Sequence, residues 1–312
     1  MALQLHARLP SLHNLKMMFY SLRKFKHHTY LLYLKGAWFL RRTFSMKIYG
    51  LGWTASQMGF EFPFYLHGAR FQFTPSAAKS YGYLPAGIPN EPETHQFLQS
   101  ILAGRSDVMF IDVGASIGEF VIPMSHTQAI SQVLAFEPHH QSREALLKSA
   151  QYAPMGKIEI IGKGVSFEKG FANFDFSSLA PTAAGIRNLD APLLQEAIEI
   201  CTLDDTVKPK PGQPVVLLID IEGGELNALR GGLKLIQNTH PLIIFEYNKT
   251  SRKFFSLSDA IELLGSSYTV FRMRSDDGRL DNDLFSTWNV VALPHLGPWA
   301  NLFQKQDLFN IN

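Results

Sequence analysis

Cysteine is nearly absent from this sequence of 312 residues, in which Cys201 is the single example. One cysteine excludes an intramolecular disulfide framework and a cysteine-cluster zinc site, and it indicates a reducing compartment, the cytoplasm. The paired histidines at 27–28 and 139–140 are adjacent and lack the i, i+4 spacing of a helical metal site. No protein-bound metal is therefore predicted. The net charge of +2 is too small to indicate a nucleic-acid partner.

Acidic residues are missing from the first 60 positions, which hold nine Lys or Arg and many apolar side chains. Apolar residues recur there at helical spacing: Leu12, Leu15, Phe19, Leu22 and Phe25. This pattern predicts an amphipathic basic helix. No signal-peptide pattern is visible, and the apolar stretch 30–40 is too short to span a bilayer.

Two interpretations of residues 1–60 remain open. In the first, the helix packs on the core and keeps its basic groups in water. In the second, the segment contacts an anionic membrane, which would place the protein peripherally on the inner face, or an anionic glycolipid substrate.

The chain divides into three predicted parts. Residues 1–89 are an extension that ends in a hairpin, with strands at 62–66 and 70–74. Residues 90–295 form the main domain, and residues 296–312 are a tail without assignable elements. Asn90 is the predicted N-cap of a helix that runs to about residue 103. A helix that leads into the first core strand in this way commonly closes over a bound cofactor.

From residue 108 onward, strands alternate with helices. Continuous apolar runs predict buried strands at 108–113, 133–136, 158–161, 215–221 and 242–245. Helices are predicted at 119–127, 141–151, 226–236 and 258–264, the last with Ser258 as its N-cap. Repeated strand–helix–strand units indicate a doubly wound, mostly parallel α/β sheet.

Two further features complete this prediction. A strand pair at 268–273 and 289–293, one of them antiparallel, ends the sheet. An insertion after the third strand holds short strands at 171–176 and 199–202, and the loop 180–192 between them is a candidate lid.

The stretch 110–120 reads as a buried strand, a glycine turn and the start of a helix, the arrangement at which open α/β sheets bind nucleotides. Its spacing is Asp-x-Gly-x-x-x-Gly, with Asp112 in place of the first glycine of the dinucleotide fingerprint. A carboxylate there repels a pyrophosphate and attracts an ammonium group. S-adenosylmethionine carries an ammonium and a sulfonium and no phosphate, so the turn favours a methyl donor.

Carboxylates follow the ends of other predicted strands, where ligands of parallel sheets bind. Glu137 lies 19 residues after Gly118 and is placed to bind ribose hydroxyls. Asp220 interrupts an apolar run, which indicates either a site next to the transferred methyl group or an N-cap of the next helix. Glu222 and Glu246 are further candidates for the site, while Glu225 fits a helix-opening acid.

Five motifs follow one another along the predicted domain: Ile-Asp-Val-Gly-Ala-Ser-Ile-Gly at 111–118, Ala-Phe-Glu-Pro at 135–138, Thr-Leu-Asp-Asp at 202–205, Ile-Asp-Ile-Glu-Gly-Gly-Glu at 219–225 and Pro-Leu-Ile-Ile-Phe-Glu at 241–246. In order and spacing they resemble the FkbM family of S-adenosylmethionine-dependent methyltransferases over about residues 88–293. The segment 90–94 is similar to the family's lead-in helix. Ser116 replaces the usual Asn and Gly224 a usual Ala, and both residues are small.

The resemblance implies a class I, Rossmann-like methyltransferase fold with seven strands, and O-methylation of a hydroxyl on a sugar, glycolipid or glycosylated natural product. Asp112, Gly114 and Gly118 would hold the methionine part of the donor, Glu137 the ribose, and Lys163 with Gly164 the adenine. The full donor set is Asp112, Gly114, Ala115, Ser116, Gly118, Glu137, Pro138, Lys163, Gly164 and Asp220.

In-line methyl transfer depends mainly on alignment of the reactants, and a base that takes the acceptor's proton increases the rate further. Asp220, Glu222 and Glu246 are the candidate bases. The same acids could instead hold Mg²⁺, which is not predicted. The rival functions are a nicotinamide-dependent sugar oxidoreductase or epimerase, which requires the dinucleotide fingerprint that the first strand lacks, and a non-catalytic membrane-docking protein. The sequence leaves the acceptor and the oligomeric state open.

Overall fold

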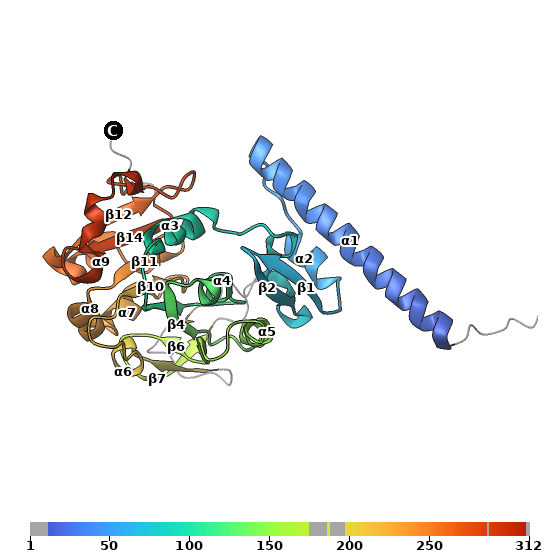
Figure 1. Cartoon of the computed structure of the whole chain (residues 1–312), viewed down its shortest axis with the longest axis horizontal. Coiled ribbons are helices and arrows are strands. Elements are labelled where there is room, and N and C mark those ends of the chain that lie inside the picture. Colours follow the sequence, from blue (N-terminus) through green and yellow to red (C-terminus); the bar gives the residue numbers. More distant parts are fainter. Residues whose placement is uncertain (1–11, 175–185, 188–196, 286, 310–312) are drawn as a thin grey trace, which may run out of the picture.

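An eight-stranded, mostly parallel sheet forms the centre of the computed structural model, which describes residues 12–174, 186–187, 197–285 and 287–309 (Figure 1). Its order is β13-β12-β14-β11-β10-β3-β4-β5. The strands are β3 (Val108–Val113), β4 (Ile130–Phe136), β5 (Ile158–Ile161), β10 (Val215–Ile219), β11 (Leu242–Glu246), β12 (Tyr268–Met273), β13 (Leu280–Asp281) and β14 (Asn289–Pro294). Neighbours from β5 to β11 are parallel, and β14 is antiparallel to both β11 and β12. The doubly wound α/β fold is confirmed, and the strand beyond the expected seven is the two-residue β13.

Helices cover both faces of this sheet, because its central strands are apolar on both sides. One face packs against α3 (Pro92–Leu102), α4 (Val121–His126), α5 (His140–Ala150) and η6 (Gly297–Gln304). The other packs against α6 (Leu203–Thr206), α7 (Glu225–Arg230), α8 (Leu233–Thr239) and α9 (Leu257–Leu264). Two short 3₁₀ turns, η4 (Ser251–Lys253) and η5 (Gly265–Ser267), flank α9.

Several predicted helix boundaries are wrong. The helix expected over 226–236 is two helices, because the helix-breaking pair Gly231-Gly232 separates α7 from α8. Ser256, not Ser258, caps α9, and it forms a reciprocal capping box with Asp259. Asn90 does not cap α3, whose N-cap position is Glu91. The side chain of Asn90 instead binds Glu119 and the amide of Tyr83.

The N-terminal extension shares the main hydrophobic core. It comprises α1 (Leu12–Phe44), α2 (Leu51–Ser56), the antiparallel hairpin β1 (Phe62–Leu66) and β2 (Ala69–Phe73), and the 3₁₀ turns η1 (Pro75–Ser80) and η2 (Leu84–Ala86). The Gln72 amide donates to Ser149 Oγ of α5 at 3.1 Å, and Ser76 Oγ donates to Glu144 Oε2 at 2.8 Å. The predicted hairpin is confirmed and lies against α5.

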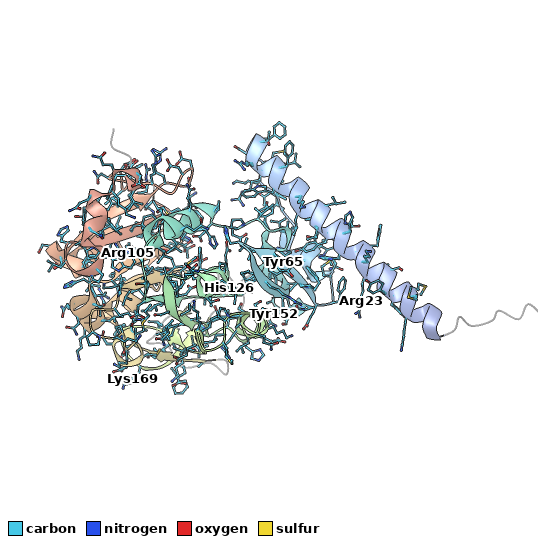
Figure 2. The ribbon with its side chains drawn as sticks, viewed as in Figure 1. Arg23, Tyr65, Arg105, His126, Tyr152 and Lys169 are labelled. Atoms are coloured by element: carbon cyan, nitrogen blue, oxygen red, sulfur yellow. The ribbon has the colours of Figure 1, made fainter. Side chains whose placement is uncertain are left out.

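The basic helix is far longer than its apolar pattern indicated. It is one helix of 33 residues, and its buried residues Tyr30, Leu34 and Ala37 pack on the extension. Arg23 and Trp38 also contact rings of the extension. These contacts confirm the packing interpretation for this part of the helix. The N-terminal half, which carries Arg23, runs out beyond the hairpin (Figure 2). Among the described residues, no helix combines the length and apolar character needed to cross a bilayer.

The insertion after β5 forms a small separate sheet of order β6-β9-β7-β8. Its strands are β6 (Gly164–Val165), β7 (Gly170–Phe174), β8 (Ile186–Arg187) and β9 (Ile198–Cys201). The two short strands expected here are therefore confirmed within a few residues. Apart from β8, the candidate lid at 180–192 lies outside the described residues.

The C-terminal segment, which the sequence left unassigned, packs into the main core. Trp299 of η6 is fully buried, and its indole N–H donates to the carbonyl of Val215 at 2.8 Å. Leu308 of η7 (Gln306–Leu308) is also buried. Residues 297–308 thus belong to the same packed body as the sheet.

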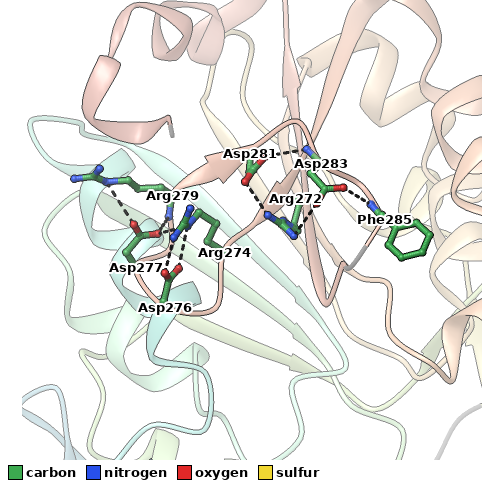
Figure 3. Close-up of polar contacts among 8 residues, drawn as sticks. All are labelled: Arg272, Arg274, Asp276, Asp277, Arg279, Asp281, Asp283 and Phe285. Carbon is green, nitrogen blue, oxygen red and sulfur yellow. Dashed lines mark hydrogen bonds and ion pairs between the residues drawn. The ribbon is translucent and has the colours of Figure 1, made fainter. Parts of the chain in front are cut away.

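Ion pairs order the connection from β12 through β13 (Figure 3). Arg272 pairs with Asp281 and Asp283, while Arg274 pairs with Asp276 and Asp277. The loop that follows Arg274 begins with Ser275, which lines the pocket described below.

Candidate functional site

The glycine turn after β3 ties the ends of three strands together. The amides of Gly114 and Ala115 both donate to the carbonyl of Phe136 at the end of β4, each at 3.0 Å. Gly114 has φ +96°, and a Cβ there would lie 1.9 Å from the carbonyl oxygen of Asp220. Only glycine fits this close approach of β3 to β10. The turn therefore holds Asp112 and Asp220 at one edge of the sheet.

The remaining residues of the turn have different surroundings. Ser116 adopts the left-handed conformation with φ 48°, and its amide donates to Glu137 Oε2 at 2.7 Å. Glu137 is buried, and its other oxygen accepts the amide of His139 at 2.6 Å. Gly118 faces α5, because a Cβ there would lie 2.6 Å from Leu146. Gly118 thus serves helix packing, while Ala115 and Ser116 line the pocket.

A pocket of about 570 Å³ opens at the carboxyl ends of β3, β10 and β11. Its wall carries seven carboxylates: Glu91, Glu93, Asp112, Glu119, Asp220, Glu222 and Glu246. The cationic residues of its lining are Arg41 of α1 and Lys79 of η1. Such a concentration of negative charge in a cavity favours a cationic ligand.

Asp112 is the most enclosed of these acids. It is 2% exposed, and its Oδ2 atom is buried without a hydrogen-bond partner. Burial, assisted by the charge of Glu137, raises the pKa of Asp112 well above its ordinary value. A buried carboxylate with an orphaned oxygen is costly unless a ligand satisfies it.

Asp220, Glu222 and Glu246 form a second group of acids in the same pocket. Each offers an oxygen, and these oxygens all lie within 4.8 Å of one another. Burial, with the charge of Glu222, raises the pKa of Glu246 to about 8, and burial with the charge of Glu246 raises that of Asp220. Glu246 is buried, and its Oε2 lacks a hydrogen-bond partner. The predicted convergence of these strand ends is confirmed.

The conformation of the loop between β10 and α7 shows which of the alternative roles Asp220 and Glu225 have. Gly224 is the N-cap of α7, so the interpretation of Asp220 as its cap is wrong. Glu225 is fully buried and accepts the amides of Ile221 and Gly223 at 3.0–3.2 Å. Glu225 therefore has the structural role that its place at the start of the helix predicted.

Lys163 and Gly164 lie in the link to the small sheet. Lys163 forms an exposed ion pair with Glu199 of β9, and Gly164 begins β6, paired with Ile200. Neither residue belongs to the lining of the acidic pocket, and the same holds for Glu137 and Pro138.

The sequence reasoning missed three acids of the pocket: Glu93 in the first turn of α3, and Glu91 and Glu119. Glu91, at the start of α3, accepts hydrogen bonds from Asn289 at 2.7 Å and Thr94 at 3.0 Å, and burial raises its pKa to about 7. Glu119 accepts the Asn90 amide and side chain at 2.7 and 2.8 Å. Both lie beside recognised motifs, so an acid count around the glycine turn could have found them.

The profile of the Methyltransferase FkbM domain matches residues 112–273, slightly more than half of the chain. This chain belongs to the FkbM methyltransferase family. The matched range runs from Asp112 of the pocket through β12, so it includes the glycine turn and the acid cluster of Asp220, Glu222 and Glu246.

Three proteins to which this FkbM-family chain is similar are distant from it in sequence. The hexuronic acid methyltransferase AglP of Haloferax volcanii is 29% identical over 143 residues, which are 46% of this chain and 56% of that protein. The chain thus spans little more than half of this curated relative. The FkbM methyltransferase of Methylobacillus flagellatus is 18% identical with a TM-score of 0.46, covering 70% of this chain and 53% of that one. A methyltransferase from Streptococcus mutans solved with S-adenosylhomocysteine is 14% identical with a TM-score of 0.39, covering 66% and 98%.

The burial of acids, together with the charges of neighbouring acids at Glu91 and Glu246, predicts how the stability of this ligand-free FkbM-family protein depends on pH. The pKa values of Glu91 and Glu137 are raised to about 7 and that of Glu246 to about 8, while unfolded carboxyls titrate near 4.3. Between these values the native state binds more protons than the unfolded state. The contribution of these three carboxyls to the free energy of unfolding is therefore complete below the ordinary carboxyl range. It is lost as the pH rises through 7 to 8, by up to about 1.4 kcal/mol per pH unit for each proton.

Thermal melting of the ligand-free protein between pH 5 and about pH 8.5 measures this dependence. The Glu246→Gln variant should show a shallower decline in the upper part of the range. A melting temperature that rises from pH 6 to pH 8 would contradict the predicted protonation of the pocket.

Proposed function

We propose that this protein transfers a methyl group from S-adenosylmethionine to a hydroxyl oxygen of a sugar, a glycolipid or a glycosylated natural product. The observation that carries the proposal is the pocket with seven carboxylates at the glycine turn of an FkbM domain. The donor is a cation with no phosphate, so the acidic lining of the pocket would attract it. The same lining would repel the pyrophosphate of a dinucleotide.

The residues present fit the donor. The orphaned Asp112 Oδ2 offers an acceptor to its ammonium group, and the turn of Gly114, Ala115 and Ser116 gives the backbone a close approach. Glu137, held by the amides of Ser116 and His139, would take the ribose hydroxyls. The adenine-side roles of Lys163 and Gly164 and the role of Pro138 beside Glu137 remain part of this proposal.

When bound, the donor supplies a methyl carbon that its sulfonium has already activated. The protein's main contribution is then alignment, which can supply ~7–11 kcal/mol. The acceptor hydroxyl must also lose its proton. Glu246 suits this task, because it belongs to the acid cluster, one of its oxygens lacks a hydrogen-bond partner, and its pKa of about 8 lies near neutral pH. Asp220 and Glu222 would hold the acceptor oxygen or share the proton with Glu246.

The N-terminal extension supports an acceptor site at one end of the pocket. Arg41 and Lys79 come from α1 and η1, outside the matched domain, and they are the cations of the lining. An acceptor with an acidic group would bind them. AglP is named as a hexuronic acid methyltransferase, and hexuronic acids carry a carboxylate. We extend this substrate class to the present chain as part of the proposal.

Two measurements test the proposed function together. Calorimetric titration should show binding of S-adenosylhomocysteine, and the absence of binding at millimolar concentration would favour the oxidoreductase or the non-catalytic alternative. Labelled donor should transfer its methyl to a hexuronic acid or lipid-linked sugar and to few peptide acceptors. Donor binding with methylation of peptides alone would keep the methyltransferase and overturn the sugar acceptor.

A further inference from the structure

The long helix α1 presents an apolar ridge to solvent. The ridge residues follow one another at four- and three-residue steps, with Thr29 and Gly36 at the intervening positions: Met18, Leu22, Phe25, Leu32 and Phe39. Each of the five is 48–69% exposed. At 3.6 residues per turn they lie on the side opposite the buried residues Tyr30, Leu34 and Ala37.

This ridge lacks a partner within the described part of the chain. From Lys16 to Lys26 every residue of α1 is exposed, including the ridge residues Leu22 and Phe25. Arg23 lies over the ring of Phe60 at 5.6 Å, but a helical segment with so little tertiary packing is marginal in water, so its stability depends on burial of an apolar face elsewhere. Exposed apolar surface of this extent marks an interaction site.

Positive charge flanks the ridge along its length. Lys24, Lys35 and Arg42 fall along one edge of the ridge and Lys26 along the other. No acid occurs on α1 or anywhere in the first 60 residues. An apolar stripe with lysines at its margins is the pattern of a helix that lies in the plane of an anionic membrane surface.

A groove of about 410 Å³ beside the ridge extends the apolar surface onto α2. Phe25, Tyr30, Tyr33, Trp53 and Met58 supply its apolar lining, and Lys26 lies at it as well. Trp53 is 66% exposed, and an exposed indole next to an apolar helix face suits the headgroup region of a bilayer.

A second copy of this chain is a poorer occupant. The spacing of the ridge resembles the seam of a coiled coil. In a dimer of two such helices, however, the flanking lysines and arginine would repel each other, because the helix has no acid to pair with them. Thr29 and Gly36 would occupy core positions of that seam, where they bury little apolar surface.

We propose that α1, together with Trp53 of α2, docks this methyltransferase on an anionic lipid bilayer. The apolar ridge enters the interface, and the flanking lysines and arginine contact the lipid phosphates. Docking on the cytoplasmic leaflet matches its anionic lipids. The same helix supplies Arg41 to the pocket, so, if the proposed function holds, a membrane-borne glycolipid is an accessible acceptor.

Sedimentation of the full chain with vesicles tests the docking without any turnover. Vesicles of phosphatidylcholine with about one third phosphatidylserine should bind the protein at low salt, and pure phosphatidylcholine vesicles should bind it far less. Higher salt should weaken binding. Removing three flanking charges, Lys24→Gln, Lys26→Gln and Lys35→Gln, should lower the partition coefficient by about 100-fold, roughly fivefold per charge.

A matched pair of triple variants separates the ridge from general apolar exposure. Leu22→Gln, Phe25→Gln and Leu32→Gln together should abolish vesicle binding. The control variant Leu147→Gln, Met155→Gln and Leu296→Gln changes three residues that are 50–100% exposed elsewhere and should bind as the unmodified chain does. Unchanged thermal melting shows that both variants fold.

Three results would overturn the proposal. They are absence of binding to anionic vesicles, equal binding to neutral and anionic vesicles, and unaltered binding of the ridge variant. A dimer in sedimentation velocity that the ridge variant converts to a monomer, without vesicle binding, would assign the ridge to a second copy instead.

Discussion

Replacing Glu246 by glutamine is expected to lower kcat by about 10²–10⁴-fold, the contribution of a positioned general base. Glutamine keeps the size of the buried side chain and cannot take the acceptor's proton. The affinity for S-adenosylhomocysteine should change by less than about threefold, because Glu246 belongs to the acid cluster with Asp220 and Glu222 and not to the glycine turn. Steady-state kinetics and calorimetry measure the two effects separately.

Companion variants distinguish the three candidate bases. Asp220→Asn should lower turnover and leave donor affinity nearly unchanged, and near-wild-type turnover would remove Asp220 from the mechanism. Glu225→Gln is the control, since Glu225 binds backbone amides and its loss should lower stability more than turnover. Activity that survives EDTA supports base catalysis, whereas loss of activity with EDTA and recovery with Mg²⁺ would assign the cluster to a metal.

Asp112→Asn is expected to change donor affinity and ligand-free stability in opposite directions. Burial raises the pKa of the Asp112 carboxyl, which means that its ionisation destabilises the ligand-free protein. The asparagine variant cannot ionise, so its melting temperature should be higher, by about 2–4 °C for each kcal/mol gained. Donor affinity should fall by about 10–100-fold, because a hydrogen bond to a charged group contributes about 1.5–3 kcal/mol.

Differential scanning fluorimetry without ligand measures the expected rise in melting temperature. Calorimetric titration with S-adenosylhomocysteine measures the expected fall in affinity. The exposed acid Asp205, which pairs with Lys169, supplies a control variant, Asp205→Asn, that should leave donor affinity unchanged. Unaltered donor affinity in Asp112→Asn would exclude Asp112 from the donor site.

The order of strands and helices in the core was predictable from local patterns. The run 108–113 coincides with β3, because a strand buried on both faces is almost continuously apolar. The run 158–161 coincides with β5, but the expectation that this strand is buried is wrong, because β5 lies at the edge of the sheet and its residues are half-buried or exposed. The boundaries of helices were less predictable, as at Ser256, because a cap depends on a hydrogen bond that neighbouring serines can equally offer. The length of α1 was underestimated, since only its middle is anchored by buried residues.

The candidate site was predictable where the residues lie at strand ends. Parallel strands bring their carboxyl ends to one edge, so Asp112, Asp220 and Glu246 had to converge. Glu91 and Arg41 could not be placed in this way, because they reach the pocket from α3 and α1, whose orientations depend on packing far along the chain.

The sequence by itself therefore determined the sheet, the glycine turn and the acids that follow β3, β10 and β11, because each depends on local spacing and the parallel topology. Only the tertiary structure decided the remaining features. It placed Arg41 and Lys79 in the lining of the pocket and left the apolar ridge of α1 facing outward. These outcomes depend on which side chains meet across long stretches of chain, and helical or strand periodicity carries no information about such contacts.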